Sequence, residues 1–339
     1  MNSEPAVISV LVANYNGAEV IRACLDSIID QQVDVPVEVL VFDDASQDDS
    51  PAIVADEYPS VHLHVSKENV GFCRANNLLA ELCRGDFLLL LNNDAWLEQG
   101  SLAALLSAAR GGADVLTLPQ LDAVSHTLLD AGMGLDLLMT PYPLRPASIE
   151  RRNVPTAMGA CLWLPKTLWE DIGGFPEWFE SIGEDLYLCQ VARVRGASVE
   201  VLREPSYLHR VGHSFGGGKV LDSGLQTTLR RRRLSERNVL YVLFVVYPLW
   251  ALILLLPIKL LILLIEGLVL SLVKTDFGLF RTIYWNAMAS LWRQRTRLLD
   301  YRRRVQDART VGALDFMRSF SFLPYKFLMV FRHGFPDVR

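Results

Sequence analysis

Four short apolar segments near the start of the chain alternate with segments of helical character. The apolar segments read ISVLVAN, VEVLVFD, VHLHV and FLLLL. Between them, residues 18–29, a segment that begins at 48–51 and residues 75–83 carry the 3–4 spacing or the capping residues of helices. Strands that alternate with helices pack as a mostly parallel sheet with helices on its faces. The sequence therefore predicts an α/β fold with a doubly wound sheet.

Polar side chains follow three of these predicted strands where each strand ends. The ends are Asn14–Tyr15, Asp43–Asp44 and Asn92–Asp94. In open α/β sheets, ligands bind beyond the carboxyl ends of the strands. Carboxylate and amide oxygens suit a hard divalent cation and a phosphorylated ligand. One such acid alone more often caps a helix or turns the chain, but three polar strand ends together predict a shared ligand site.

The pattern weakens over residues 110–152 and then resumes. The Pro-rich residues 141–155 predict a mobile loop. Residues 156–175 predict a strand and a helix that stops at two glycines, and residues 184–196 predict a helix. Glu184 and Asp185 lie in its first turn, where the positive end of a helix favours anions. Further strand is expected in residues 197–209.

Charge divides the chain into two parts. Residues 1–225 contain 14 basic and 31 acidic residues, whereas residues 226–339 contain 19 basic and 7 acidic residues. This asymmetry predicts a domain over 1–225 and a second, basic region over 226–339. The five cysteines form no CxxC pair, which is typical of a reducing compartment. The N-terminus lacks the basic segment of a signal peptide, so we expect the first domain to stay in the cytoplasm.

An apolar run of 35 residues, Val239–Val273, is interrupted only by Lys259 and Glu266. One straight helix of this length measures about 50 Å, more than a simple membrane crossing needs. Pro257 divides the run, and arginines flank both sides, which favours two cytoplasmic ends. We expect a helical hairpin, re-entrant or shallow in the membrane, that anchors the protein to the cytoplasmic face of a bacterial inner membrane. A hairpin buried in a soluble core is the alternative.

The last segment, residues 316–334, mixes aromatic residues with Arg and Lys. This mixture is typical of an interfacial segment that contacts anionic membrane lipid. A basic region can also bind nucleic acid, but the interleaved apolar run favours lipid, and we expect no nucleic-acid partner.

Six blocks of residues 6–218 resemble the family 2 glycosyltransferases, which have the GT-A nucleotide-sugar fold. The blocks are SVLVANYNGAEVIRACLDSI, VEVLVFDDASQDDS, ENVGFCRANN, GDFLLLLNNDAWLEQGSL, GACLWLPKTLWEDIGGF and GEDLYLCQVARVRG. They occur in the order that the family shows. The LNND block is most similar to the rhamnosyltransferase-like branch that acts on bacterial surface polysaccharides, including lipopolysaccharide of the cell envelope.

The resemblance implies roles for residues of the donor site. Tyr15 and the backbone at Ala13 would hold the nucleotide base, and Asp44 would accept a hydrogen bond from the base N–H beside a supporting Asp43. Three residues of the ENVGFCRANN block would line the donor site: Gly71, Arg74 and Asn77. For Arg74, a phosphate contact and an exposed position in solvent remain equally open.

LNND occupies the place of the family's metal motif. The resemblance implies that Asp94 binds Mg²⁺ or Mn²⁺ together with His209, and that Asn93 lies near the ribose. Asn92 stands where the strict motif has an acid, so the protein contributes less negative charge. We therefore expect weak metal binding until the diphosphate of the nucleotide arrives.

The resemblance also implies a catalytic block at GED. Asp185 would be the general base and Glu184 would orient the acceptor, although both residues could instead only cap the following helix. Tyr187 stands where the family often has a further acid. His213 and the glycines that follow it are expected to form a mobile flap.

Together these features imply an inverting, metal-dependent glycosyltransferase. Its donor would be a nucleoside-diphosphate sugar of the dTDP or UDP type, and its acceptor a glycan or a polyprenyl-linked sugar. A non-catalytic scaffold of a polysaccharide assembly complex with the same fold is the first alternative. A nucleotidyltransferase is the second, although ANYNGAEV lacks the Gly-rich basic loop that such an enzyme needs.

Overall fold

The computed structural model describes residues 7–146, 151–211, 217–221, 224–334 and 337–338. The chain forms two compact units. The N-terminal unit comprises Met1–Met133, Pro143–Ala192 and Ala197–Ser214, and the helical unit comprises Gly134–Tyr142, Arg193–Gly196 and Phe215–Arg339. Each unit is described by itself below.

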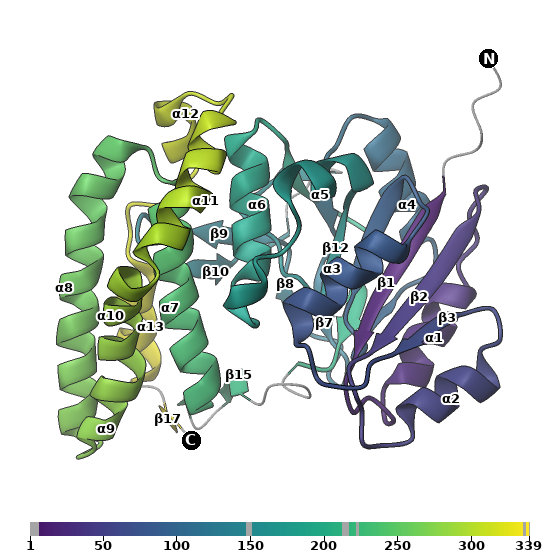
Figure 1. Cartoon of the computed structure of the whole chain (residues 1–339), viewed down its shortest axis with the longest axis horizontal. Coiled ribbons are helices and arrows are strands. Elements are labelled where there is room, and N and C mark those ends of the chain that lie inside the picture. The colour runs from purple at the N-terminus through teal and green to yellow at the C-terminus, as the bar shows by residue number, and fades with distance from the viewer. Residues whose placement is uncertain (1–6, 147–150, 212–216, 222–223, 335–336, 339) are drawn as a thin grey trace. The chain divides into compact units, whose positions relative to one another are not determined.

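The N-terminal unit is built on an eight-stranded sheet (Figure 1). Its order is β11 (Arg151–Asn153), β13 (Val199–Leu202), β6 (Val115–Thr117), β12 (Cys161–Pro165), β4 (Phe87–Leu91), β1 (Ile8–Asn14), β2 (Val37–Asp43) and β3 (His62–Val65). Strands β4, β1, β2 and β3 are parallel, whereas β12 runs antiparallel to both of its neighbours. The predicted mostly parallel α/β sheet is confirmed.

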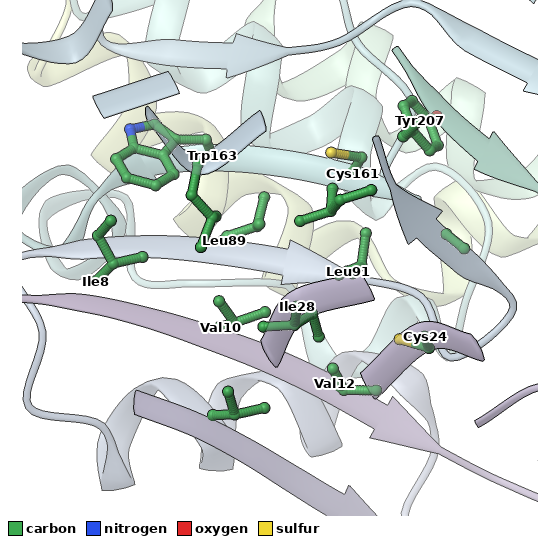
Figure 2. Close-up of a cluster of buried hydrophobic side chains, with 14 of the residues drawn as sticks. Ile8, Val10, Val12, Cys24, Ile28, Leu89, Leu91, Cys161, Trp163 and Tyr207 are labelled. Carbon is green, nitrogen blue, oxygen red and sulfur yellow. The ribbon is translucent and has the colours of Figure 1, made fainter. Parts of the chain in front are cut away.

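Helices cover this sheet. They are α1 (Ile21–Ile29), α2 (Ser50–Glu57), α3 (Phe72–Leu82), α4 (Ser101–Arg110), α5 (Lys166–Ile172), the 3₁₀ turn η1 (Glu177–Phe179) and α6 (Glu184–Val194). Alternate residues of β1 and β4, such as Val10 and Leu89, pack on one face with Ile28 of α1 (Figure 2). This alternation follows from the two-residue period of a strand. The apolar segments thus form a buried layer, and the polar residues at their strand ends lie at one edge of the sheet.

A second sheet contributes to the same unit. Its order is β5 (Ala95–Leu97), β14 (Tyr207–His209), β7 (Gln120–Asp122) and β8 (Leu128–Asp130). Because β5 follows β4 after only three residues, this sheet begins at the end of the LNND block. It brings His209 beside that block from more than a hundred residues further along the chain.

The Pro-rich segment 141–155 differs from the predicted loop in part. Strand β10 (Pro141–Pro143) pairs with β9 (Met133–Leu135), and β11 pairs with β13 at the edge of the large sheet. An edge strand needs only one partner, so three residues beside β13 suffice for pairing. Residues 147–150 lie outside the described part of the chain.

The apolar run of the helical unit forms the end of one helix and the whole of the next, but it is not divided at Pro257. Its elements are α7 (Leu229–Val246), α8 (Leu249–Val273), α9 (Phe277–Leu279), the π-helix η2 (Phe280–Trp285), α10 (Asn286–Arg293), α11 (Arg295–Asp307), α12 (Ala313–Met317), α13 (Tyr325–His333) and a small sheet of β15 (Gly217–Leu221), β16 (Gly224–Thr227) and β17 (Asp337–Val338). Pro257 lies inside α8, so the prediction that Pro257 divides the apolar run is wrong.

The break falls at Pro248 instead. Tyr247 is extended, with ψ at 138°, as expected of a residue that precedes proline. Pro248 caps α8 in a position where its missing N–H costs no helical hydrogen bond. Pro257 removes one such bond from the middle of α8, and the helix continues through it.

The two charged residues of the apolar run both face the interior of the helical unit. Lys259 is buried, and Oε2 of Glu266 lies 2.6 Å from Nζ of Lys326 in α13. Glu236 of α7 also accepts from Lys326, at 2.6 Å, and Arg232 pairs with both glutamates. The ion pairs therefore join α7, α8 and α13, and the outward side of α8 is left to apolar residues.

Candidate functional site

Asn14, at the end of β1, ties the ends of three parallel strands together. Its Nδ2 donates to Oδ2 of Asp43 at 2.8 Å and to Oγ of Ser50 at 2.9 Å. Its Oδ1 accepts from Nδ2 of Asn93 at 2.8 Å. Sequence reasoning places Asn14 at a polar strand end but assigns it no role, and the structure shows that it connects the Asp43 and Asn93 positions.

Gly17 leaves room for this connection. A Cβ atom at Gly17 would lie 2.1 Å from Oδ1 of Asn14 and 2.5 Å from Nδ2 of Asn93. Both distances are far below van der Waals contact, so the turn after β1 needs a residue without a side chain. The NG pair of the sequence therefore has a packing reason as well as a turn signal.

Asp44 holds the turn that precedes α3. Its two carboxylate oxygens accept from the backbone N–H groups of Val70, at 2.6 Å, and of Gly71, at 2.9 Å. Burial raises the pKa of Asp44, the two backbone donors oppose this, and the charge of Asp43 adds to the increase. Gly71 has φ of +89°, which glycine adopts without strain. Each carboxylate oxygen keeps a second lone pair. Asp44 can therefore accept the predicted hydrogen bond from a base N–H without losing these two bonds.

Asp94 and His209 form a buried pair. Nε2 of His209 lies 3.1 Å from Oδ1 of Asp94. Asp94 is 2% exposed and His209 is 9% exposed. Two ligands that sit at right angles on one cation, each about 2.1 Å away, are separated by roughly 3 Å. The pair is therefore already at the spacing of neighbouring metal ligands.

A cation here needs ligands from outside the protein. Among the described residues, no three His, Cys, Asp or Glu side chains come together as a metal cluster. Asp94 and His209 supply one oxygen and one nitrogen, which suits Mg²⁺ or Mn²⁺ when phosphate oxygens and water complete the shell. The residues present thus fit a metal that binds together with a diphosphate.

A buried thiol lies beneath this pair. Sγ of Cys24 in α1 donates to the carbonyl of Asn92 at 3.5 Å. Burial raises the pKa of Cys24 strongly, and the charge of Asp94 adds to the increase. All five cysteines of the chain are free thiols and all are buried.

Asp185 lies in the first turn of α6. Its Oδ2 accepts from the N–H of Gly159 at 3.0 Å, and its Oδ1 accepts from the N–H of Leu186 at 2.7 Å. Glu184 beside it is buried, whereas Asp185 is half-buried. The charges of Asp185 and Asp94 both act on the Tyr207 hydroxyl. The predicted base and the predicted metal ligand therefore lie in one region of the N-terminal unit.

The other predicted donor-site residues differ in their surroundings. Tyr15 is 47% exposed just beyond the end of β1, and Arg74 is exposed in the first turn of α3. Asn77 makes both of its side-chain bonds with the backbone of Phe175, at 2.9 Å each. Ala13 pairs with Phe42 within the sheet, and the N–H of Asn92 donates to the carbonyl of Ala160 at 3.0 Å. Their donor roles stay predictions, and His213 lies outside the described residues.

Sequence reasoning misses three buried residues around His209. Gln120 contacts Nδ1 of His209 at 2.9 Å, and Tyr207 donates its hydroxyl to Oε1 of Gln120 at 2.9 Å. Asp130, opposite Gln120 on β8, is also buried. Gln120 and Asp130 lie in the weakly patterned residues 110–152, and only the paired strands of the second sheet bring them to Tyr207 and His209.

Comparison with known proteins identifies the fold and the family. Residues 9–173 match the model of glycosyl transferase family 2. This match, over about half of the chain, supports a family 2 glycosyltransferase domain. The predicted GT-A fold is confirmed by the structure of GalNAc-T7 with UDP, GalNAc and Mn²⁺, which superposes with a TM-score of 0.54 at 15% identity over 60% of this chain and 43% of that one.

Two curated relatives are also similar in sequence. The putative glycosyltransferase EpsH of Bacillus subtilis (strain 168) is 33% identical over 33% of this chain. The match covers 33% of that relative's length. The N-acetylglucosaminyl-diphospho-decaprenol L-rhamnosyltransferase of Mycobacterium tuberculosis is 25% identical over 62% of this chain and 78% of its own length. The recognised family 2 glycosyltransferase domain is thus confirmed, and a rhamnosyltransferase is among its relatives.

Asp130 generates a pH-dependent prediction. Burial raises its pKa to about 7, while the N–H of Gly132 and the charge of His209 act in the opposite direction. Folded Asp130 therefore keeps its proton up to about pH 7, whereas the unfolded chain releases it near pH 4. Between about pH 4 and pH 7, the contribution of Asp130 to the free energy of unfolding falls by about 1.4 kcal/mol per pH unit. The reason is that Asp130 binds a proton in the folded state but not in the unfolded state.

The Asp130→Asn variant lacks this titration. Urea unfolding in EDTA at pH 5, 6, 7 and 8 should show that the wild type loses stability relative to the variant up to pH 7 and no further above it. Parallel curves across the whole range would contradict the raised pKa of Asp130.

Proposed function

We propose that the protein is an inverting, metal-dependent glycosyltransferase. It moves a sugar from a nucleoside-diphosphate donor to a hydroxyl group of a lipid-linked or growing bacterial glycan. The observation that carries the proposal is the Asp94–His209 pair, at 3.1 Å, where β4 ends in a family 2 domain. The GalNAc-T7 structure, which has the same fold, contains UDP and Mn²⁺.

Residues at different strand ends bind different parts of the donor. The base lies against Tyr15, and Asp44 accepts a hydrogen bond from its N–H, while Asp43 is held by Asn14 and Ser46. Asp94 and His209 would hold the cation, which would stabilise the negative charge of the leaving diphosphate. Asn92 adds no charge, so nucleotide and cation bind together.

Asp185 takes a proton from the acceptor hydroxyl. The hydroxyl oxygen then forms a bond to the anomeric carbon, and the bond from that carbon to the diphosphate oxygen breaks with its electron pair. The N–H of Gly159 holds one carboxylate oxygen of Asp185 at 3.0 Å, which fixes the carboxylate plane. Glu184, buried beside it, orients the acceptor. Attack from the side opposite the diphosphate inverts the anomeric configuration.

The first test is the Asp185→Asn variant. An amide cannot accept the proton, so transfer should fall by roughly 10²–10⁴-fold, while UDP and dTDP affinities stay near the wild-type values. Transfer is measured by mass spectrometry of the product, and nucleotide binding by calorimetry. Asp171→Asn, at an exposed position of α5, is the matched control. Full turnover by Asp185→Asn would exclude the base role, and no turnover by the wild type with any donor would favour the scaffold.

The second test is the Asp94→Asn variant, which keeps the shape of the side chain. Calorimetry should show that Mn²⁺ increases the affinity of the wild type for UDP, and that EDTA reverses the increase. The variant should bind UDP equally with Mn²⁺ and with EDTA. His126→Ala, which removes an exposed histidine of the same unit, should retain the metal effect. A metal effect that survives Asp94→Asn would place the cation elsewhere.

We infer that the protein acts at the cytoplasmic face of the bacterial inner membrane. Helix α8 is the one helix of the described residues that is long and apolar enough to cross a membrane, by length and composition. Large apolar residues with 36–67% exposure recur along it at 3–4 spacing, from Leu249 to Val273. Lys259 and Glu266 face the opposite, protein side, so the outward stripe is uncharged.

Lipid fits this stripe better than another protein. The helical unit exposes Trp285 and Trp292 as well, and aromatic rings of this kind sit at the membrane interface. Arg295 stacks on the ring of Trp292 at 4.6 Å, and the segment from residue 226 carries a large excess of positive charge. Anionic lipid complements both properties, so α8 binds shallowly with one face. A lipid-linked acceptor and the enzyme would then be bound to the same membrane.

The membrane prediction concerns the double variant Leu261→Glu, Ile265→Glu. Both residues lie on the exposed stripe, so two carboxylates should prevent insertion and reduce flotation with phosphatidylglycerol vesicles at least about tenfold. Val65→Glu, at an exposed apolar residue of the N-terminal unit, is the control and should float like the wild type. Unchanged flotation of the double variant would exclude α8 as the binding face, and a change from dimer to monomer without lipid would indicate a second copy as the partner.

A further inference from the structure

Gln120 is a buried amide at the start of β7 that has no place in the proposed chemistry so far. Strand β7 runs parallel to β14, with Gln120 in register with Tyr207. Because side chains alternate along a strand, Tyr207 and His209 point to the same face of β14. The ring centroids of these two residues are 6.4 Å apart, and the Gln120 amide contacts both side chains. The three residues form a buried row that ends at Asp94.

The hydrogen bonds of this row run in one direction. The Tyr207 hydroxyl donates to Oε1 of Gln120 at 2.9 Å, so the amide nitrogen of Gln120 faces Nδ1 of His209, also at 2.9 Å. An amide nitrogen can only donate, which makes Nδ1 the acceptor. A neutral imidazole has one N–H, and it must then lie on Nε2, where it donates to Oδ1 of Asp94 at 3.1 Å.

This arrangement is incompatible with a cation on Nε2. A metal needs the lone pair of the nitrogen that binds it, so the ring proton must then be on Nδ1. If the Gln120 amide turns by half a rotation, Oε1 faces Nδ1 and accepts its N–H, while the amide nitrogen donates to the Tyr207 oxygen. The number of protons on His209 is the same in both arrangements.

In the second arrangement, the Tyr207 hydroxyl turns its hydrogen away from Gln120. Among the acids whose charge acts on the Tyr207 hydroxyl, Asp130 has the largest effect. Asp130 lies opposite Gln120 on the neighbouring strand β8, and it is buried. The two arrangements therefore differ in the orientations of the Gln120 amide and the Tyr207 hydroxyl.

We propose that Gln120 is a positioning residue of the metal site, whose amide orientation decides which nitrogen of His209 carries the proton. One orientation pairs His209 with Asp94 in the absence of metal, and the other presents the Nε2 lone pair to the cation. The proposal rests on the proposed metal role of Asp94 and His209. It adds that metal loading is coupled to rotation of one buried amide.

The direct test is the protonation pattern of His209 by ¹⁵N NMR of the full chain, assigned by comparison with His209→Asn. The metal-free wild type should show the Nε2–H form, and addition of Mg²⁺ with UDP should convert it to the Nδ1–H form. A metal-free protein with the Nδ1–H form would overturn the proposal, whether or not the protein binds metal. If the wild type binds neither Mg²⁺ nor Mn²⁺ with UDP, the proposed metal function fails while the assignment in the metal-free protein is still decided.

Two variants separate positioning from simple packing. Gln120→Glu has only acceptor oxygens, so His209 should carry its proton on Nδ1 without metal, and Mn²⁺ affinity measured by electron paramagnetic resonance with UDP should equal or exceed that of the wild type. Gln120→Met fills the space without a hydrogen bond, and Mn²⁺ affinity should fall roughly 10–100-fold. Wild-type affinity of Gln120→Met would overturn the proposal.

The control is Gln190→Met, which removes another buried glutamine of the same unit. Gln190 donates to the carbonyl of Pro155 at 2.6 Å, so the substitution costs a comparable buried hydrogen bond. Its Mn²⁺ affinity and the His209 spectrum should match the wild type even if its melting temperature falls. An equal loss of Mn²⁺ affinity in both variants would show that general destabilisation is the cause, which overturns the positioning role.

Discussion

The side chain of Asn14 fixes the geometry on which the rest of the N-terminal unit depends. Strands β1, β2 and β4 end side by side. A group that both donates and accepts hydrogen bonds is needed to connect the carboxylate of Asp43 with the amide of Asn93. The Asn14 amide does both, since it donates to Asp43 and accepts from Asn93. A buried amide that satisfies its partners in this way specifies one arrangement, because each alternative leaves a polar group without a bond. The hydrogen bonds of Asn14 therefore join the ends of β1, β2 and β4.

Much of this architecture was predictable, because it follows from local patterns. The period-two apolar strands and the 3–4 spacing of α1 determine the core face, and the polar residues after β1, β2 and β4 must then share one edge. Asp94 and His209 were found by resemblance to a family, since no local rule relates residues so far apart in the chain. The structure adds their contact, at 3.1 Å.

The remaining features depend on tertiary packing. Gln120 and Asp130 lie on three-residue strands with no visible periodicity, and their importance comes only from the neighbours that pairing gives them. At Pro257 the local sequence is misleading. Proline predicts a helix break, but α8 continues through it. Lys259 and Glu266, about two turns apart beyond Pro257, face the interior of the helical unit. Local sequence contains no information on that interior.

The thiol of Cys24 has a consequence for the choice of metal. It lies against the backbone of Asn92, and the charge of Asp94 acts on it. A thiolate is a soft ligand that favours zinc or copper over magnesium and manganese. Burial and the nearby carboxylate keep the thiol protonated, and only the thiolate is a good ligand. A cation at the proposed metal site would therefore have a neutral thiol, which is a poor ligand, beside the Asn92 backbone.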